Sequence, residues 1–257
     1  MQRGDRLIHS LSDSFFSLCL APFNVGVYLT AQAENPSLFM DVINYLDRRG
    51  EIVWNLLLEH LWLVFVSIGI AVIVSVIVGI IISYYAKAAD TVLAVCQVLM
   101  TVPSIAMLGM MVPFFGIGFT TGVVALILYS LLPIVRNTYT GIIEIDPVII
   151  ESATGMGMTE WRVLTKIKIP LAMPVIMAGI RTATVMIVGI AAVTAYVGAG
   201  GLGELIFQGI SRSSEEMIIV GAIGVSIIAL IFDYILSWAE RIFTLRSKGR
   251  EDRQLSS

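Results

Sequence analysis

The sequence predicts an all-α membrane protein, built as a polytopic bundle of five core transmembrane helices. Only 14% of the 257 residues are charged and 57% are hydrophobic, and the mean hydropathy is +0.90. A soluble domain carries roughly 25% charged residues, because its surface must face water. The apolar stretches also lack the period-two alternation of a membrane β-barrel. The composition therefore argues against a soluble enzyme, a disordered chain and a disulfide-rich secreted scaffold.

Five apolar stretches are each long enough to cross a bilayer, which takes about 20 residues at 1.5 Å rise per residue. All five are rich in isoleucine, valine, leucine, alanine and glycine. In chain order they cover roughly residues 61–85, 91–112, 122–139, 174–197 and 217–239. Each stretch is predicted to form one transmembrane helix.

Lysine and arginine gather in three segments that a five-span chain puts on one side of the membrane. These segments follow the first, third and fifth stretches and contain Lys87, Arg162, Lys166, Lys168, Arg241, Arg246, Lys248, Arg250 and Arg253. The loops on the opposite side, roughly 114–121 and 198–216, contain one basic residue, Arg212. Because cytoplasmic loops carry an excess of lysine and arginine, the basic side is predicted to be cytoplasmic.

Residues 1–50 are expected to form an N-terminal extension, for which three interpretations stay open. Arg3 and Arg6 precede a moderately apolar run over residues 15–29, which Pro22 and other residues interrupt. The run fits a cleaved signal-like segment or a sixth, N-terminal membrane helix. It also fits upstream sequence ahead of a true start at Met40.

The loop after the third stretch begins with a helix-start signal. Aspartate at position 146 can cap free amides, and Pro147 suits the first helical position. The helix is expected to run to about Thr154, where Gly155 and Gly157 stop it because glycine tolerates positive φ.

A second short helix is predicted in the same loop. Thr159 is expected to cap it, it should run toward Ile167, and Pro170 should break the chain before the fourth span. Two short helices that meet at a glycine turn form a structured element on the inner membrane face, as a docking surface requires.

This loop resembles the EAA motif of ABC-transporter permeases, in which a Glu-Ala-Ala group, a glycine and an Ile-x-Leu-Pro group recur at fixed distances. The residues that fall on the pattern are Glu151, Ala153, Gly157, Ile167 and Pro170. Ser152 and Ile169 depart from it, as small or apolar replacements for alanine and leucine. In that family the element is a cytoplasmic coupling helix held in a cleft of the ATPase subunit. The resemblance therefore implies that these five residues form the ATPase-coupling loop.

Further segments resemble the osmoprotectant (quaternary-amine) permeases of binding-protein-dependent importers. They lie at residues 101–104, 128–141, 145–147, 174–182 and 198–203. The resemblance implies an ABC permease transmembrane domain over 51–241, followed by a basic cytoplasmic tail over 242–257. It also implies uptake of glycine betaine, carnitine, choline or related compatible solutes. A permease for methionine or another small solute shares the layout and stays an alternative, and a channel is a less favoured one.

The segment 198–203 reads Gly-Ala-Gly-Gly-Leu-Gly and satisfies GxGxxG, but a dinucleotide site needs this run between a strand and a helix of a soluble unit. Here it follows a membrane helix, so the glycines are expected to allow close packing or to line a cavity as part of an outer gate. The candidate pathway and gate residues are Arg181, Tyr196, Gly198, Gly200, Gly201, Gly203 and Glu204. Arg181 lies about 10 Å into the fourth span, and Glu204 is a candidate contact for a cationic solute at the outer mouth.

Aromatic faces hold quaternary ammonium groups by cation–π attraction. The tyrosines within or near spans are Tyr129, Tyr139 and Tyr196, which are scattered along the chain. In the resembling family the aromatic cage belongs to the solute-binding protein, so the permease is expected to be a low-affinity path. Near the inner end of the fifth span, Arg241 is a candidate partner for Asp233.

No catalytic residue and no metal site is predicted. None of the lysines is followed by serine or threonine, so a Walker A loop cannot be made. This chain is therefore not expected to be an enzyme or to bind a cofactor, and ATP and magnesium are expected on a partner ATPase. A net charge of −3 gives no basic surface for nucleic acid.

The resemblance also implies the partners and the location. It implies a second, identical or related permease subunit, ABC ATPase subunits, an extracytoplasmic solute-binding protein, the solute and membrane lipid. The expected location is the bacterial cytoplasmic (inner) membrane, with several passes.

Overall fold

A computed structural model describes residues 36–255, so the residues on which all three interpretations of the N-terminal segment depend lie largely outside the described part. The chain divides into two compact units, residues 1–50 and 51–257. Helix α3 (Pro36–Tyr84) is interrupted at Arg49, whose backbone angles of φ −128° and ψ 18° are not helical. The helix begins well before the predicted span, because the polar residues ahead of it are helical too.

The regular elements of the second unit are all helices, with no strand among its described residues. After α3 come α4 (Ala86–Thr101), α5 (Ser104–Phe115), α6 (Phe119–Ile143), α7 (Pro147–Gly155), α8 (Glu160–Val163), the π-helix η2 (Leu164–Lys168), α9 (Ile169–Thr194), the 3₁₀ turn η3 (Ala195–Val197), α10 (Gly203–Arg212) and α11 (Glu215–Leu255). Four described helices are long and apolar enough to cross a membrane, and the bent pair α4 and α5 is a fifth candidate. The all-α membrane fold is confirmed.

The second predicted span is not one straight helix. It is divided between α4 and α5, which meet at an angle of 103°. Val102 is extended at ψ 130° and precedes Pro103, as expected because a proline ring disfavours helical angles in the residue before it. The hydroxyl of Tyr129 on α6 donates a hydrogen bond of 2.5 Å to the Val102 carbonyl. The break therefore has a buried partner that satisfies a carbonyl outside the helical ladder.

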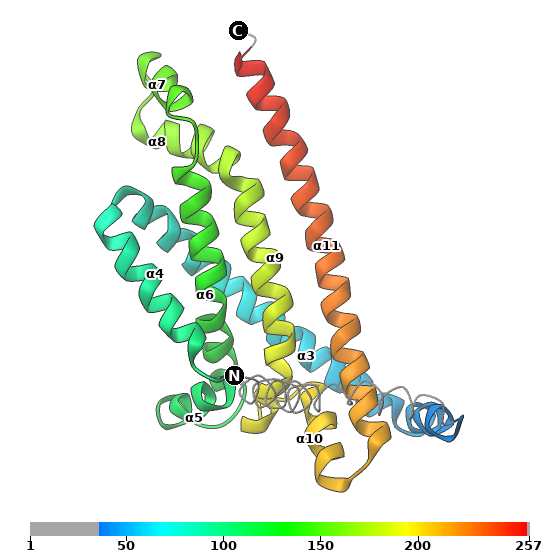
Figure 1. Cartoon of the computed structure of the whole chain (residues 1–257). Coiled ribbons are helices and arrows are strands. Elements are labelled where there is room, and N and C mark those ends of the chain that lie inside the picture. Colours follow the sequence, from blue (N-terminus) through cyan, green and yellow to red (C-terminus); the bar gives the residue numbers. More distant parts are fainter. Residues whose placement is uncertain (1–35, 256–257) are drawn as a thin grey trace, which may run out of the picture. The chain divides into compact units, whose positions relative to one another are not determined.

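Helix α6 is at the centre of the second unit. It packs against α9, α4 and α5, while α11 packs on α9; in Figure 1 these long helices run side by side, with α7 and α8 at one end and α5 and α10 at the other. Ala71 of α3, Ile134 of α6 and Ala183 of α9 form one buried cluster.

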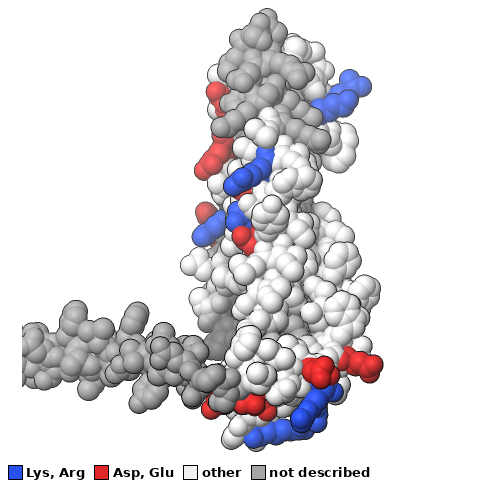
Figure 2. Space-filling model, turned by 90° about the vertical axis from the view of Figure 1, so that its right-hand side faces the viewer, with Lys and Arg blue, Asp and Glu red and all other residues white. Residues whose placement is uncertain are grey.

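Glycines let the helix backbones of α3, α6 and α9 approach closely. A Cβ atom added at Gly79 would lie 2.6 Å from Cβ of Thr138, and one at Gly179 would lie 2.6 Å from Cβ of Asn137. Small residues at helix contacts are typical of membrane bundles, in which van der Waals packing replaces the hydrophobic drive. Figure 2 shows one face of the outer surface. On this face an uncharged area separates the charged side chains of the lower end from those of the upper half.

Candidate functional site

The loop between α6 and α9 begins with the predicted cap. The Asp146 carboxylate accepts a hydrogen bond of 2.9 Å from the Val148 amide, and Pro147 is the first residue of α7. Gly155 stays helical and only Gly157, at φ +79°, turns the chain. The Gly157 amide donates to the Thr154 carbonyl and the Met158 amide to the Ala153 carbonyl, at 2.9 and 3.2 Å. These two bonds form a Schellman motif, which needs a left-handed residue at the position of Gly157.

Two of the predicted coupling residues lie inside the loop's own small core. Ala153 and Ile167 are buried with Val163, and Ile149 and Met158 are among the residues packed against them. Their side chains therefore hold α7 against α8 and η2, so any contact with a partner has to come from other residues.

Pro170 does not break the chain, so that expectation is wrong. The segment from Glu160 runs through η2 into α9 without interruption. The Ile169 amide donates to the Leu164 carbonyl, five residues back. Such a π-bulge widens the helix, so the missing amide and the ring of a proline at the next position are accommodated. Thr159 precedes α8 in an extended conformation but makes no side-chain cap.

The exposed face of this loop carries large apolar side chains, which the motif did not indicate. Glu151 is exposed, and around it the side chains of Val148, Met156 and Trp161 are 64%, 76% and 71% exposed. Large apolar side chains exposed next to a structured turn are typical of a protein contact surface. These side chains could have been predicted from the sequence as large apolar residues within a predicted loop.

The glycine segment at the opposite end caps α9 and packs against other helices. Gly198, at φ +74°, ends η3 with a second Schellman motif, in which the Ala199 amide donates to the Thr194 carbonyl at 3.3 Å. Gly203 lies so close to the Ala192 backbone of α9 that a Cβ atom there would overlap it. The Gly201 amide donates a hydrogen bond of 3.2 Å to the Glu59 carboxylate of α3.

A cavity of about 380 Å³ opens beside this segment. Its lining comes from Glu59 and Trp62 of α3, Phe119 of α6, Glu204 of α10 and residues 198–200. Three of the candidate gate residues, Gly198, Gly200 and Glu204, therefore share one pocket. The tyrosine at 196 is not among its lining residues: it is 66% exposed, with its ring 5.9 Å from that of Phe207.

Arg181 lies in a different place, between α9 and α11. Its guanidinium donates to both oxygens of Asp233, at 2.7 and 3.0 Å, and to Glu240 at 3.3 Å. All three charges line a cavity of about 430 Å³. The partner of Asp233 is thus Arg181 and not Arg241, because the two residues on neighbouring helices face each other across the α9–α11 contact.

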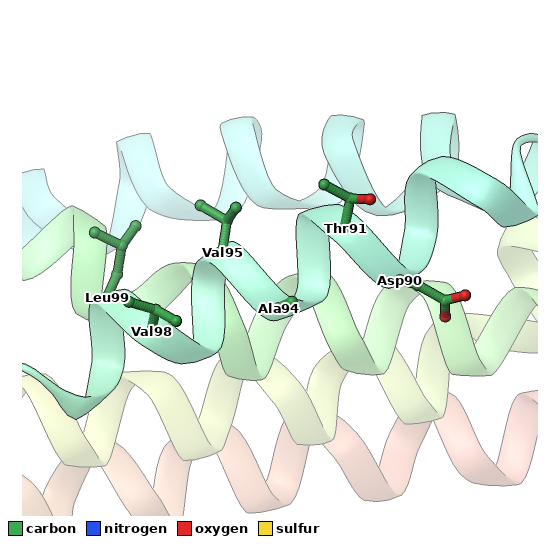
Figure 3. Close-up of a pocket in the computed structure, with 6 residues that line it drawn as sticks. All are labelled: Asp90, Thr91, Ala94, Val95, Val98 and Leu99. Carbon is green, nitrogen blue, oxygen red and sulfur yellow. The ribbon is translucent and has the colours of Figure 1, made fainter.

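Neither Tyr129 nor the groove along α4 forms an enclosed solute site in the described part of the chain. Tyr129 is buried, and its hydroxyl donates a hydrogen bond to the Val102 carbonyl at the break between α4 and α5. A groove of about 550 Å³ runs along α4, but Figure 3 shows that all its lining residues, among them Asp90, Val95 and Leu99, come from this single helix. In the part of the chain that the structure describes, no group of three histidine, cysteine, aspartate or glutamate side chains could hold a metal ion.

Residues 71–248 match the family described as "Binding-protein-dependent transport system inner membrane component". The chain belongs to this family. It is therefore an inner-membrane transport subunit of a system that uses a binding protein.

Three relatives illustrate the similarity of this inner-membrane component. It is 44% identical to the osmoprotectant import permease protein OsmW of Salmonella typhimurium, over 80% of this chain and 98% of the relative. It is 42% identical to the glycine betaine/carnitine/choline transport system permease protein OpuCB of Bacillus subtilis, over 72% and 86%. It is 38% identical to the choline transport system permease protein OpuBB of the same organism, over 79% and 94%.

Solved transporters share the fold. The inward-facing MetNI methionine ABC transporter contains a chain that superposes with a TM-score of 0.65 at 25% identity, over 75% of this chain and 95% of that one. A chain of a bacterial alginate ABC transporter in complex with its periplasmic protein superposes with a TM-score of 0.59 at 13% identity, over 90% and 97%.

Proposed function

We propose that this inner-membrane component is the permease subunit of an ABC importer for glycine betaine, carnitine, choline or related quaternary amines. The observation that carries the proposal is the identity of 38–44%, over 72–80% of this chain and 86–98% of the relatives, to permeases whose names specify osmoprotectants or such solutes. The methionine transporter is less similar, at 25% identity.

The energy of transport comes from ATPase subunits that dock on the loop of α7, α8 and η2. ATP and magnesium bind to those subunits, and this chain binds no cofactor. Glu151 and the apolar side chains of Val148, Met156 and Trp161 form the contact, because they are exposed on a loop whose buried residues keep it rigid. Ala153, Gly157, Ile167 and Pro170 act indirectly, since they set the shape of that surface.

Transport proceeds by alternating access in a pair of permease subunits, identical or related. A solute-binding protein delivers the solute at the end that carries the glycine segment. Closure of the ATPase subunits moves the docking loops together, and the helices that begin at these loops carry the movement through the membrane. Arg181, midway along α9, and the candidate gate residues between Tyr196 and Glu204 contact or surround the moving solute.

The coupling role is tested with a matched pair of glycine variants. Gly155 and Gly157 both leave open space for a side chain, but only Gly157 has a positive φ. Gly157→Val should therefore distort the docking surface, whereas Gly155→Val should leave it intact. With both variants purified in complex with the ATPase, we expect solute-stimulated ATP hydrolysis to fall at least tenfold for Gly157→Val only. Equal stimulation in both variants would contradict the proposed coupling.

The solute is tested by uptake into proteoliposomes that hold the complete importer. We expect ATP-dependent uptake of choline or glycine betaine, which unlabelled methionine does not reduce. Uptake of methionine would favour the alternative importer, and uptake that needs no ATP would favour a channel.

A further inference from the structure

We infer that the pocket between α3, α6, the glycine segment and α10 is a binding site of the permease itself for a quaternary ammonium cation. The inference rests on the proposed function, because it names the place where the solute first contacts this chain. Its evidence is the combination of charge, aromatic faces and size in one cavity.

Two carboxylates define the charge of the pocket. Glu59 comes from α3 and Glu204 from the first turn of α10, and the remaining lining residues within the described part of the chain are aromatic or small and carry no positive charge. Neither carboxylate belongs to the ion pairs of the described residues, which join Arg181 to Asp233 and Glu240. The pocket therefore attracts a cation and repels an anion.

Two aromatic side chains supply the second contact. Trp62 and Phe119 line the same cavity, and their side chains are 60% and 39% exposed. Tryptophan alone is common at membrane interfaces, but two glutamates beside it are not what a lipid contact requires. A quaternary ammonium has no proton to donate, so it is held by aromatic faces and by the field of nearby carboxylates. The cavity of about 380 Å³ lies in the range of roughly 300–1,000 Å³ that small-molecule sites occupy.

The glycines hold the Glu59 carboxylate at the edge of the pocket. A Cβ atom on Gly200 would lie 2.7 Å from the Glu59 carboxylate oxygen that accepts the Gly201 amide. Both glycines have positive φ, of 84° and 87°. The backbone is thus shaped to receive the carboxylate, which leaves its other oxygen for the solute.

Binding is measured on the full-length permease in nanodiscs, by saturation-transfer NMR with choline as the probe. We expect Glu204→Gln and Trp62→Leu each to weaken choline binding about 3- to 30-fold, the range that one charge or one cation–π contact supplies. Trp238→Leu is the matched control, because Trp238 is equally exposed, at 63%, but lies on α11 outside the pocket. Glu204→Asp keeps the charge and should retain binding. Glu59 is left unchanged because it also binds Gly201.

The chemical class is tested with 3,3-dimethylbutan-1-ol, the neutral carbon analogue of choline. Choline should bind and this alcohol should not. Binding of both probes alike, or choline binding that neither pocket variant reduces, would overturn the inference. Transport by the complete importer is measured separately. If the importer takes up choline and the pocket variants reduce neither binding nor uptake, the inference about the pocket is refuted but the proposed function is not. Choline binding to the pocket in an importer that transports no quaternary amine refutes the proposed function.

Discussion

At the residue scale, Arg181 makes both ion pairs that the described residues contain. It lies within a membrane helix and binds Asp233 through two hydrogen bonds and Glu240 through one. Charges inside membrane helices are costly unless they are paired, and the charges of this cluster are paired with one another and line a common cavity. The pairing also fixes α11 against α9, since the two carboxylates are on one helix and the guanidinium on the other.

Replacing Arg181 should destabilise the protein more than replacing one of its two carboxylate partners. Arg181→Gln leaves two carboxylates close together without a cation, whereas Glu240→Gln leaves the two-bond pair with Asp233 intact. We expect the yield of monodisperse protein in mild detergent to fall several-fold for Arg181→Gln and little for Glu240→Gln. A normal yield of Arg181→Gln would show that the cluster does not hold the helices together.

A second prediction at this scale concerns the hydroxyl group of Tyr129. Tyr129→Phe removes the donor to the Val102 carbonyl, and the loss of this part-buried hydrogen bond should cost about 0.5–1.5 kcal/mol. The midpoint of thermal unfolding in detergent should fall. Tyr139→Phe is the control, because Tyr139 contributes its ring to the cluster of Ile82, Ala89 and Val135 and the ring is kept. Equal midpoints for the two variants would contradict a role for the hydroxyl.

At the scale of elements, the contact between α6 and α9 depends on glycine. A Cβ atom at Gly179 would lie 2.6 Å from Cβ of Asn137 and 2.8 Å from the carbonyl oxygen of Pro133. Both neighbours are fixed: the Asn137 side chain donates to the Pro133 carbonyl at 2.7 Å. An added methyl group can therefore be accommodated only if the helices move apart.

Alanine substitution on α9 tests this contact with an internal control. Gly179→Ala should destabilise the protein by about 1–3 kcal/mol through overpacking. Gly189→Ala, on the same helix, meets no atom within 4 Å and should be neutral or slightly stabilising, because alanine favours helix. The measurement is thermal unfolding of both variants in the same detergent. Destabilisation of the two to the same extent would point to helix propensity or lipid contact instead of packing.

The elements also show what the sequence could predict. Apolar length predicts four of the five spans as single long helices, and the Asp146–Pro147 signal predicts α7, because both depend on local chemistry; the break within the second span is not predicted by its length. Pro103 and Pro170 could not be distinguished in this way. One bends the chain by 103° and the other lies in a continuous helix. The difference is the π-bulge before Pro170, in which Leu164 and Ile167 are buried and which no local sequence pattern predicts.

The site was predictable to the same degree. The glycine segment and Glu204 were found from their composition, but Glu59, Trp62 and Phe119 precede them by many residues and join them only through the packing of α3 and α6. In the same way, the sequence favours a partner for Asp233 close by in the chain, whereas its partner Arg181 lies 52 residues away.

At the scale of the whole molecule, the two ends of the described bundle differ in chemistry. One end has the docking loop with its exposed apolar side chains, and the other has the acidic and aromatic pocket. Lysine and arginine are concentrated at the docking end in sequence, which predicts that this end is cytoplasmic.

Cysteine labelling tests this orientation. In a variant whose Cys19 and Cys96 are replaced by alanine, single cysteines are placed at Trp161 and Ile117, which are 71% and 79% exposed. A membrane-impermeant maleimide should label position 117 in intact spheroplasts and position 161 only in inverted vesicles from cells that express the permease alone. Labelling of position 161 from outside would reverse the assigned orientation.

The unbroken helical path through Pro170 has a mechanical consequence. Helix α9 follows η2 directly and is one continuous helix from Ile169 to Thr194, about 39 Å long at 1.5 Å per residue. It starts at the docking loop and ends at the glycine segment beside the pocket. A tilt of about 5° at its inner end would therefore move its outer end by about 3 Å. The helix acts as a lever arm, by which a small rotation on one side of the membrane can open or close a pocket on the other.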